Sequence, residues 1–242
     1  MNVEHDSNCC LKRLIYNGKN LVCTPWGAEV GNWTSFWSQE KESQNMSCCA
    51  ITSNSLVNEF YIPKFSLKVV QREQWSEDTL ERTYSFFVTS HVFLGDVVNR
   101  LTFSAHSLTT AVVNGRSHLF EGKDRRYIAR ENSVRLKNDV EVKIRAQYAV
   151  CERLSASFFP QLYVRDECNG AWAVHARWIA KYPGDKYICR TRPFNIKVPA
   201  VFFGKKQFLA REFDSRKFVN CGSVVWCEEG DWFRISLKVR VI

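Results

Sequence analysis

Several segments of the chain alternate large apolar residues with polar ones at a period of two. The pattern is clearest in Phe65–Val70, Val140–Ala146 and Phe233–Val241. Successive side chains of a β-strand point to opposite faces, so each segment buries one face and turns its charged face to water. The alternation therefore predicts strands rather than helices.

Shorter apolar segments indicate more strands, with turn-forming residues between them. The further predicted strands are Tyr84–Val88, Leu101–His106, Gln161–Arg165, Trp172–Ile179 and Tyr187–Arg190. The turn signals are Asn114-Gly115, Asn169-Gly170, Pro183-Gly184-Asp185 and Glu229-Gly230-Asp231. Short strands with turns at this spacing predict an all-β, antiparallel sandwich architecture with few and short helices.

A repeated segment predicts how the chain is divided. Gly122-Lys123-Asp124 precedes Arg126–Glu131, and Gly204-Lys205-Lys206 precedes Gln207–Glu212, with an amphipathic strand after each. Two copies of one β module explain this repeat. We therefore expect a flexible N-terminus (1–14), a first sandwich unit (15–150) and a second unit (151–242). The second unit is short enough to lack its first strands.

Three of these segments resemble a known family. The Gly122-Lys123-Asp124 motif, the following Arg126–Glu131 segment and Leu136–Ile144 are similar to the end of a MATH (TRAF-like) domain, as in speckle-type POZ adaptors. The resemblance implies two antiparallel TRAF-like β-sandwich units that bind extended peptides and have no catalytic activity. Family members that direct ubiquitination also carry a BTB domain, for which a chain ending at Ile242 has no room.

The same resemblance implies a peptide-binding groove. Its residues are Tyr84, Leu101, Lys123, Asp124 and Arg125. Tyr84 matches a groove tyrosine of the family, Leu101 replaces a phenylalanine, and Lys123-Asp124 matches the groove loop. Arginine replaces the aromatic residues that follow this loop in the family, which favours acidic or phosphorylated peptides. The alternative is a half-buried strand tyrosine and an ordinary charged turn.

The net charge of +9 is concentrated in the second half of the chain. Residues 151–242 hold 16 Lys and Arg against 9 Asp and Glu, a balance of +7. Basic residues interleaved with aromatic ones are typical of single-strand nucleic-acid binding. The alternative is that the aromatic residues lie in the core and the charges on the opposite strand faces. The segment concerned contains Arg190, Arg192, Phe194, Lys197, Phe202, Phe203, Lys205, Lys206, Arg211, Arg216 and Lys217.

Catalytic and metal-binding motifs are not recognisable in the sequence. The ten cysteines do not show zinc-ligand spacing, and none of the five histidines belongs to a catalytic motif. We therefore expect no enzyme activity, no cofactor and no metal, with most cysteines reduced. The polar N-terminus and the lack of a long apolar run predict a cytoplasmic or nuclear protein without a membrane segment.

Together, these features lead to one functional prediction and one alternative. The prediction is a non-catalytic protein-interaction adaptor that binds short extended peptides of a partner protein and is linked to substrate recognition for ubiquitination. The alternative is a basic β-sandwich that binds nucleic acid.

Overall fold

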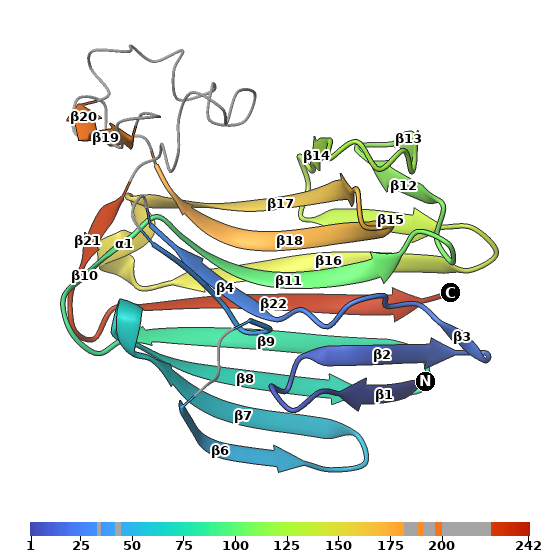
Figure 1. Cartoon of the computed structure of the whole chain (residues 1–242), viewed down its shortest axis with the longest axis horizontal. Coiled ribbons are helices and arrows are strands. Elements are labelled where there is room, and N and C mark those ends of the chain that lie inside the picture. Colours follow the sequence, from blue (N-terminus) through green and yellow to red (C-terminus); the bar gives the residue numbers. More distant parts are fainter. Residues whose placement is uncertain (33–34, 42–44, 182–187, 191–196, 200–223) are drawn as a thin grey trace.

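Two large antiparallel sheets form the body of the protein (Figure 1). The computed structural model describes residues 1–32, 35–41, 45–181, 188–190, 197–199 and 224–242, with side chains left out for 45–48, 188–190 and 197–199. The described part is nearly all β, which confirms the predicted fold class. Among these residues, no helix is both long and apolar enough to cross a membrane.

The smaller of the two large sheets has six strands. Its strands in spatial order are β14 (Arg126–Ile128), β17 (Phe158–Glu167), β18 (Ala171–Ala180), β11 (Asp96–Ser104), β4 (Ala28–Gly31) and β5 (Phe36–Ser38). Strand β18 is buried along its whole length on both faces. A strand that is buried on both sides must provide partners for every polar side chain it carries.

The larger sheet has nine strands. Their spatial order is β13 (Arg116–Leu119), β12 (Thr110–Val113), β15 (Ser133–Lys137), β16 (Glu141–Val150), β22 (Trp232–Val241), β9 (Thr79–Val88), β8 (Leu67–Trp75), β7 (Ser55–Ile62) and β6 (Asn45–Ile51). Buried and exposed residues alternate along β22, as the sequence pattern predicts. The predicted Asn114-Gly115 turn joins β12 to β13, and both residues have positive φ, at 53° and 76°.

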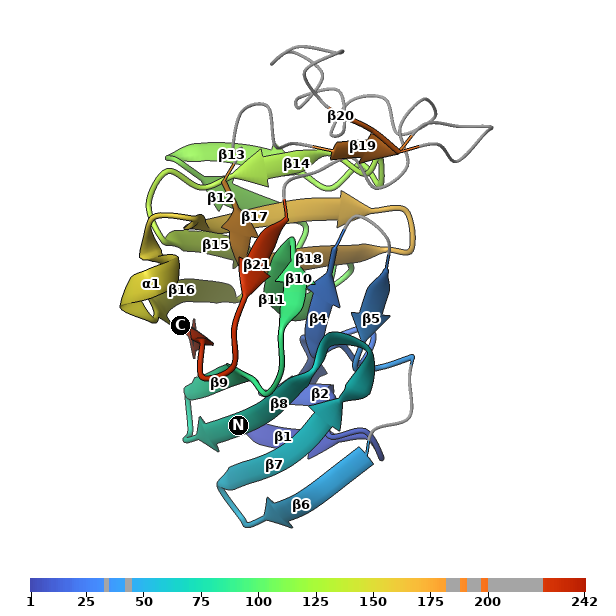
Figure 2. The same cartoon turned by 90° about the vertical axis from the view of Figure 1, so that its left-hand side faces the viewer.

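Three small sheets and two short helices complete the described fold. A three-stranded sheet lies beside the nine-stranded sheet, and its His5 forms a hydrogen bond through Nε2 with Oε2 of Glu73 on β8 (2.8 Å). Figure 2 shows the two-stranded ribbon of β10 and β21 from the side. The remaining elements are β1 (Asn2–His5), β2 (Leu11–Tyr16), β3 (Lys19–Asn20), β10 (Val92–Leu94), β21 (Val225–Cys227), β19 (Ile188–Arg190), β20 (Lys197–Pro199), the 3-10 helix η1 (Pro63–Phe65) and the helix α1 (Glu152–Ser155).

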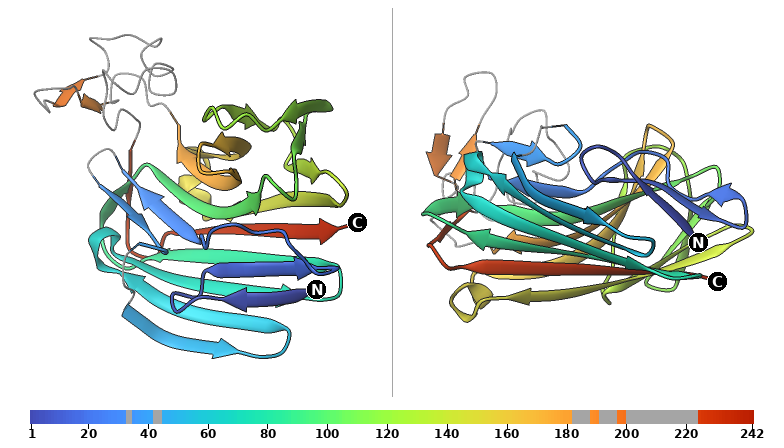
Figure 3. Two further views of the ribbon diagram at one scale, coloured as in Figure 1. Left: turned by 45° about the vertical axis from the view of Figure 1, so that its right-hand side comes forward. Right: turned by 90° about the horizontal axis from the view of Figure 1, so that it is seen from below.

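The ends of the chain lie beside the same turn, between β8 and β9 (Figure 3). The Met1 ammonium group donates to the Glu77 carbonyl (3.0 Å), and the Val241 N–H donates to the Asp78 carbonyl (2.8 Å). One apolar cluster, which includes Trp172 and Phe103, fills the space between the sheets. Both sheets contribute to this cluster, so its burial stabilises the two layers together.

Strands from both sides of residue 150 share each large sheet. Strand β22 pairs with β16 on one side and β9 on the other, while β18 pairs with β11. The two TRAF-like units, of which the second would lack its first strands, are therefore not confirmed, and the boundary at 150/151 stays a prediction. The second copy of the repeated motif (204–212) lies outside the described residues.

Candidate functional site

Two of the predicted groove residues point into the core. Tyr84 on β9 is fully buried and donates a hydrogen bond from its hydroxyl to Gln39 Oε1 (2.7 Å). Leu101 on β11 is 1% exposed and belongs to the apolar cluster. The two residues lie on different sheets, with their side chains in the layer between them. Neither side chain faces the surface.

The other three predicted groove residues lie in the loop between β13 and β14. Lys123 and Arg125 form ion pairs with Glu121, at 2.7 and 3.1 Å, and Asp124 pairs with Arg165 at 3.1 Å. The loop residues are exposed and thus separate from Tyr84 and Leu101. A peptide-binding role for the five residues stays a prediction that no observation tests.

The basic segment predicted to bind nucleic acid lies almost wholly outside the described residues. For Arg190 and Lys197 only the strand backbone is described, in β19 and β20. Nucleic-acid binding by this segment therefore also remains untested.

A group of charged and titratable side chains lies on the face of the six-stranded sheet that points away from the apolar cluster. Val97, Leu101, Trp172 and Val174 face the core, so alternate residues of β11 and β18 face outward. The strand register places Arg100 directly opposite His175. We call this largely buried layer of side chains the charged face and define it by Glu29, Asp96, Arg100, Tyr163, Glu167, His175 and Arg177.

Arg100 is the centre of the charged face. Its Nη1 donates to Glu29 Oε1 at 2.7 Å, and its Nη2 donates to both Glu167 carboxylate oxygens, each at 2.7 Å. The guanidinium also lies 3.3 Å from the ring centroid of Trp26. Arg100 is only 7% exposed, so two carboxylates and an aromatic ring replace its lost hydration.

His175 lies beside this arginine without a hydrogen-bond partner for its Nε2. The imidazole is 5% exposed and stacks on Tyr163, with ring centroids 4.5 Å apart. Its Nδ1 lies 4.0 Å from Glu29 Oε2, beyond hydrogen-bond distance. Burial, followed by the positive charges of Arg100 and Arg177, lowers the pKa of His175 well below its usual value, so the ring is neutral at pH 7.

Glu29 is the second proton-exchanging group of the charged face. Burial raises the pKa of Glu29 to about 7, against the opposing attraction of Arg100. A carboxyl group that titrates near neutrality can both donate and accept a proton under physiological conditions. The charged face thus brings together a titrating carboxyl group and a neutral imidazole whose Nε2 has no partner.

Arg177 closes the other side of the charged face. Its Nε and Nη2 donate to Gln161 Oε1 at 3.0 and 2.6 Å, and its Nη1 lies 3.6 Å from Asp96 Oδ2. The guanidinium lies 5.0 Å from the ring centroid of Tyr163. These contacts hold Tyr163 in place and so orient the imidazole stacked on it.

In the described part of the chain, no cluster of three or more His, Cys, Asp or Glu side chains has the geometry of a metal site. On the charged face, Glu29 and His175 are side chains that can take part in proton transfer.

Sequence reasoning missed Glu29, Arg100 and His175. His175 and Arg177 interrupt the otherwise apolar segment Ala171–Ala180, and Arg100 lies within Val97–Phe103, where the other polar residues are Asn99 and Thr102. A charged residue in a strand buried on both faces needs a partner, and that signal was available in the sequence. The identity of that partner could not be read from the sequence, because Glu29 lies 71 residues before Arg100 in the chain.

Comparisons with known proteins give a likeness of fold only. No protein-family model matches the chain, and no curated protein matches it. A galactose mutarotase-like protein from Clostridium acetobutylicum matches with a TM-score of 0.52 and 8% identity, over 99% of this chain and 91% of that one. A galactose mutarotase-like protein from Lactobacillus casei matches with a TM-score of 0.50 and 10% identity, over 99% of both chains.

These likenesses correct the predicted resemblance. The structural neighbours are galactose mutarotase-like sandwiches, so the prediction of MATH (TRAF-like) domains is wrong. The prediction of a non-enzymatic adaptor linked to ubiquitination rested on that resemblance and is contradicted by the same finding. The motifs misled because period-two strands and Gly-containing turns occur in every antiparallel sandwich, whatever its strand order.

Proposed function

We propose that the protein is a sugar-converting enzyme that interconverts the two anomers of an aldose on the charged face. The observation that carries the proposal is the pair formed by Glu29, with a pKa of about 7, and the neutral, unpartnered imidazole of His175, 4.0 Å apart. The fold supports the proposal, because two proteins of similar fold are described as galactose mutarotase-like, and a mutarotase catalyses this reaction.

The reaction requires one proton acceptor and one proton donor. The vacant Nε2 of His175 accepts the proton of the anomeric hydroxyl, while protonated Glu29 gives its proton to the ring oxygen as the bond from C1 to that oxygen breaks. Rotation about C1–C2 in the open-chain aldehyde presents its other face. Ring closure then returns both protons, so the product is an isomer of the substrate.

The charges of the site act on the open-chain state in two directions, because Arg100 and Arg177 oppose protonation of His175 whereas Arg100 favours the Glu29 carboxylate. Proton transfer converts a neutral pair into imidazolium and carboxylate, which attract each other across a poorly hydrated site. Arg100 donates a hydrogen bond to Glu29 and so stabilises the carboxylate that forms. Tyr163, stacked on His175, keeps the ring plane fixed.

This assignment predicts a descending pH profile. Glu29 must be protonated to act as the acid, and its pKa is about 7. His175 stays neutral through the same range, because its pKa lies well below the usual value. The rate should therefore be highest below pH 7 and fall as pH rises through about 7.

Anomer exchange tests the proposal directly. Freshly dissolved α-anomers of galactose, glucose and an acidic aldose are followed by polarimetry, with and without the protein. We expect catalysis above the spontaneous rate for at least one sugar, and a loss of about 100-fold or more in Glu29→Gln and His175→Asn. His106→Asn is the matched control, because His106 is exposed and lies beyond the end of β11, outside the charged face.

Two results would overturn the proposal. One is a rate equal to the spontaneous rate for every sugar tested with folded protein. The other is full activity in both Glu29→Gln and His175→Asn.

A further inference from the structure

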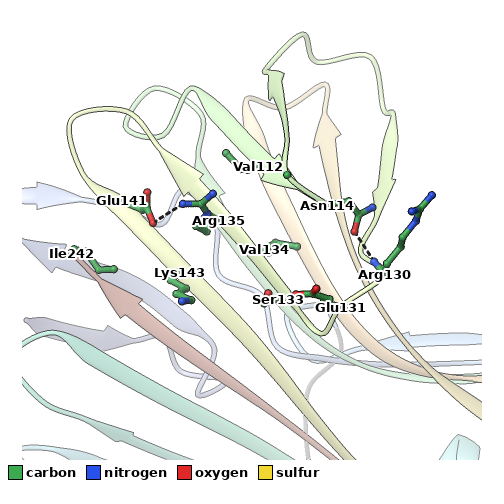
Figure 4. A pocket seen from close by; sticks show the side chains of 11 residues that line it. Val112, Asn114, Arg130, Glu131, Ser133, Val134, Arg135, Glu141, Lys143 and Ile242 are labelled. Atoms are coloured by element: carbon green, nitrogen blue, oxygen red, sulfur yellow. Dashed lines mark hydrogen bonds and ion pairs between the residues drawn. The ribbon is translucent and has the colours of Figure 1, made fainter.

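A pocket opens on the other large sheet, away from the charged face. Its volume is about 470 Å³, and it lies where β12, β15 and β16 meet the C-terminal Ile242 (Figure 4). Figure 4 shows Arg130 and Asn114 on one wall and Arg135 and Lys143 on the other. The wall is braced by the Asn114 side chain, which accepts the Arg130 N–H (2.7 Å) and donates to the Ile128 carbonyl (2.9 Å).

Positive charges face one another across the strands beside this pocket. The register places Arg135 opposite Lys143, and Lys143 opposite Arg240. In the neighbouring row, Arg145 lies opposite Lys238. Val142, Ile144 and Val239 face the core, so these five cations face outward. We call Arg135, Lys143, Arg145, Lys238 and Arg240 the basic face.

Acidic residues flank the basic face, and Glu81 on β9 lies directly opposite Lys238 in the strand register. Arg135 pairs with Glu141 at 3.5 Å, and Arg240 pairs with Asp78 at 3.1 Å. Among the described residues, Lys143, Arg145 and Lys238 have no carboxylate within ion-pair distance. Like charges directly opposite each other destabilise a sheet. Such an arrangement is explained when an anion binds between the cations.

The lining of the pocket indicates what kind of anion fits. Beside its cations, it offers the Asn114 amide, the Ser133 hydroxyl and the Glu131 carboxylate. These groups can donate to and accept from a row of sugar hydroxyls. None of its lining residues is aromatic, whereas single-stranded nucleic acids are held largely by stacking on aromatic side chains.

We propose that the pocket and the basic face bind an acidic oligosaccharide, with one sugar unit in the pocket and the following charged units along Lys143, Arg145 and Lys238. Lys143 and Arg145 are two residues apart on β16, about 6.8 Å, and Arg145 and Lys238 lie on neighbouring strands about 4.8 Å apart. The spacing of the three cations is therefore comparable to the length of a sugar unit. Arg135 and Arg240 can change partners from their carboxylates to the ligand. The proposal does not depend on catalysis at the charged face, because it uses a different sheet.

Binding of defined oligomers to the full chain tests this inference. Isothermal titration is performed with an oligogalacturonate, a sulfated oligosaccharide, a neutral glucan oligomer and a single-stranded DNA of equal charge. We expect binding to the carboxylated oligomer, the sulfated oligomer or both, and none to the neutral one. The two acidic arms distinguish carboxylate from sulfate as the recognised group.

Two sets of variants on the nine-stranded sheet test whether binding depends on the basic face. Lys143→Gln combined with Arg145→Gln should weaken binding about tenfold or more, because two charge-assisted contacts are lost. Arg72→Gln on β8 removes an exposed cation from the same sheet and should leave affinity unchanged.

Three outcomes would overturn the proposal. The first is equal binding of neutral and acidic oligosaccharides, or no binding of either acidic oligomer. The second is unchanged affinity in the folded double variant. The third is tighter binding of the DNA, which would make the basic face a nucleic-acid surface.

Discussion

The outer faces of the two large sheets handle charge in opposite ways. On the six-stranded sheet, Arg100 is 7% exposed and is held by Glu29 and Glu167 at 2.7 Å. On the nine-stranded sheet, Arg145 and Lys238 are exposed and face each other as like charges. The strand geometry is the same in both places, so the difference arises from what surrounds the side chains.

Burial explains why the charged side chains of the charged face form ion pairs. A buried charge without a partner costs several kcal/mol, so opposite charges must interlock there. On the basic face, water screens the repulsion and reduces its cost to a fraction of that value. Pairing in the first region is therefore required for folding, whereas water allows like charges to lie opposite each other in the second region.

Removing the central arginine should have the largest effect. Arg100→Ala leaves the buried carboxyl groups of Glu29 and Glu167 without their shared partner, so we expect the free energy of unfolding to fall by about 3–5 kcal/mol. Urea unfolding at pH 8 measures it. Arg145→Ala on the basic face should change stability by less than about 0.5 kcal/mol.

A second variant separates lost pairing from lost packing. Arg100→Met combined with Glu29→Gln and Glu167→Gln removes all three charges and should recover most of the loss. If Arg100→Ala costs no more than Arg145→Ala, the contrast between the two faces is wrong.

Glu29 should make stability depend on pH in an unusual direction. Its pKa is about 7 in the folded protein and lies near the ordinary 4.5 when unfolded, so the folded state holds the proton more tightly. Glu29 therefore contributes about 3 kcal/mol to the free energy of unfolding below about pH 4.5, and this contribution is lost as the pH rises to 7. The measurement is the difference in unfolding free energy between wild type and Glu29→Gln from pH 5 to pH 8. A difference that stays constant with pH would show that Glu29 is not buried as a neutral acid.

Reversing one charge on the basic face should have the smallest effect on stability. Lys143→Glu places an acid between Arg135 and Arg240, so two like-charge pairs become opposite-charge pairs. We expect a gain of up to about 1 kcal/mol in unfolding free energy, together with loss of acidic-oligosaccharide binding. Lys68→Glu on β8 is the comparison, since it breaks an existing pair with Glu59 (2.8 Å). Destabilisation by Lys143→Glu would show that the positive rows are not repulsive.

Local patterning predicted the strands well. The alternation in Phe233–Val241 became β22, and the Asn114-Gly115 turn lies where expected. The apolar run around Trp172 became β18. These features depend on neighbouring residues only, because side-chain alternation and positive φ are properties of a few consecutive residues.

The same limit applies to two of the predicted groove residues. Tyr84 and Leu101 were placed on a surface by resemblance, but both face the core. A period of two shows that alternate residues share one face of a strand, but it does not show which face packs against the other sheet. Only packing of the second sheet decides that.

The sequence by itself determined that this chain is all-β, with strands and turns at positions that short-range geometry dictates. The tertiary structure alone decided the strand order, and with it which side chains meet on the charged face and the basic face. Glu29 meets Arg100 because β4 pairs with β11, and Arg100 meets His175 because β11 pairs with β18. The physical reason is that pairing between distant strands depends on burial of the whole apolar layer, which no local segment encodes.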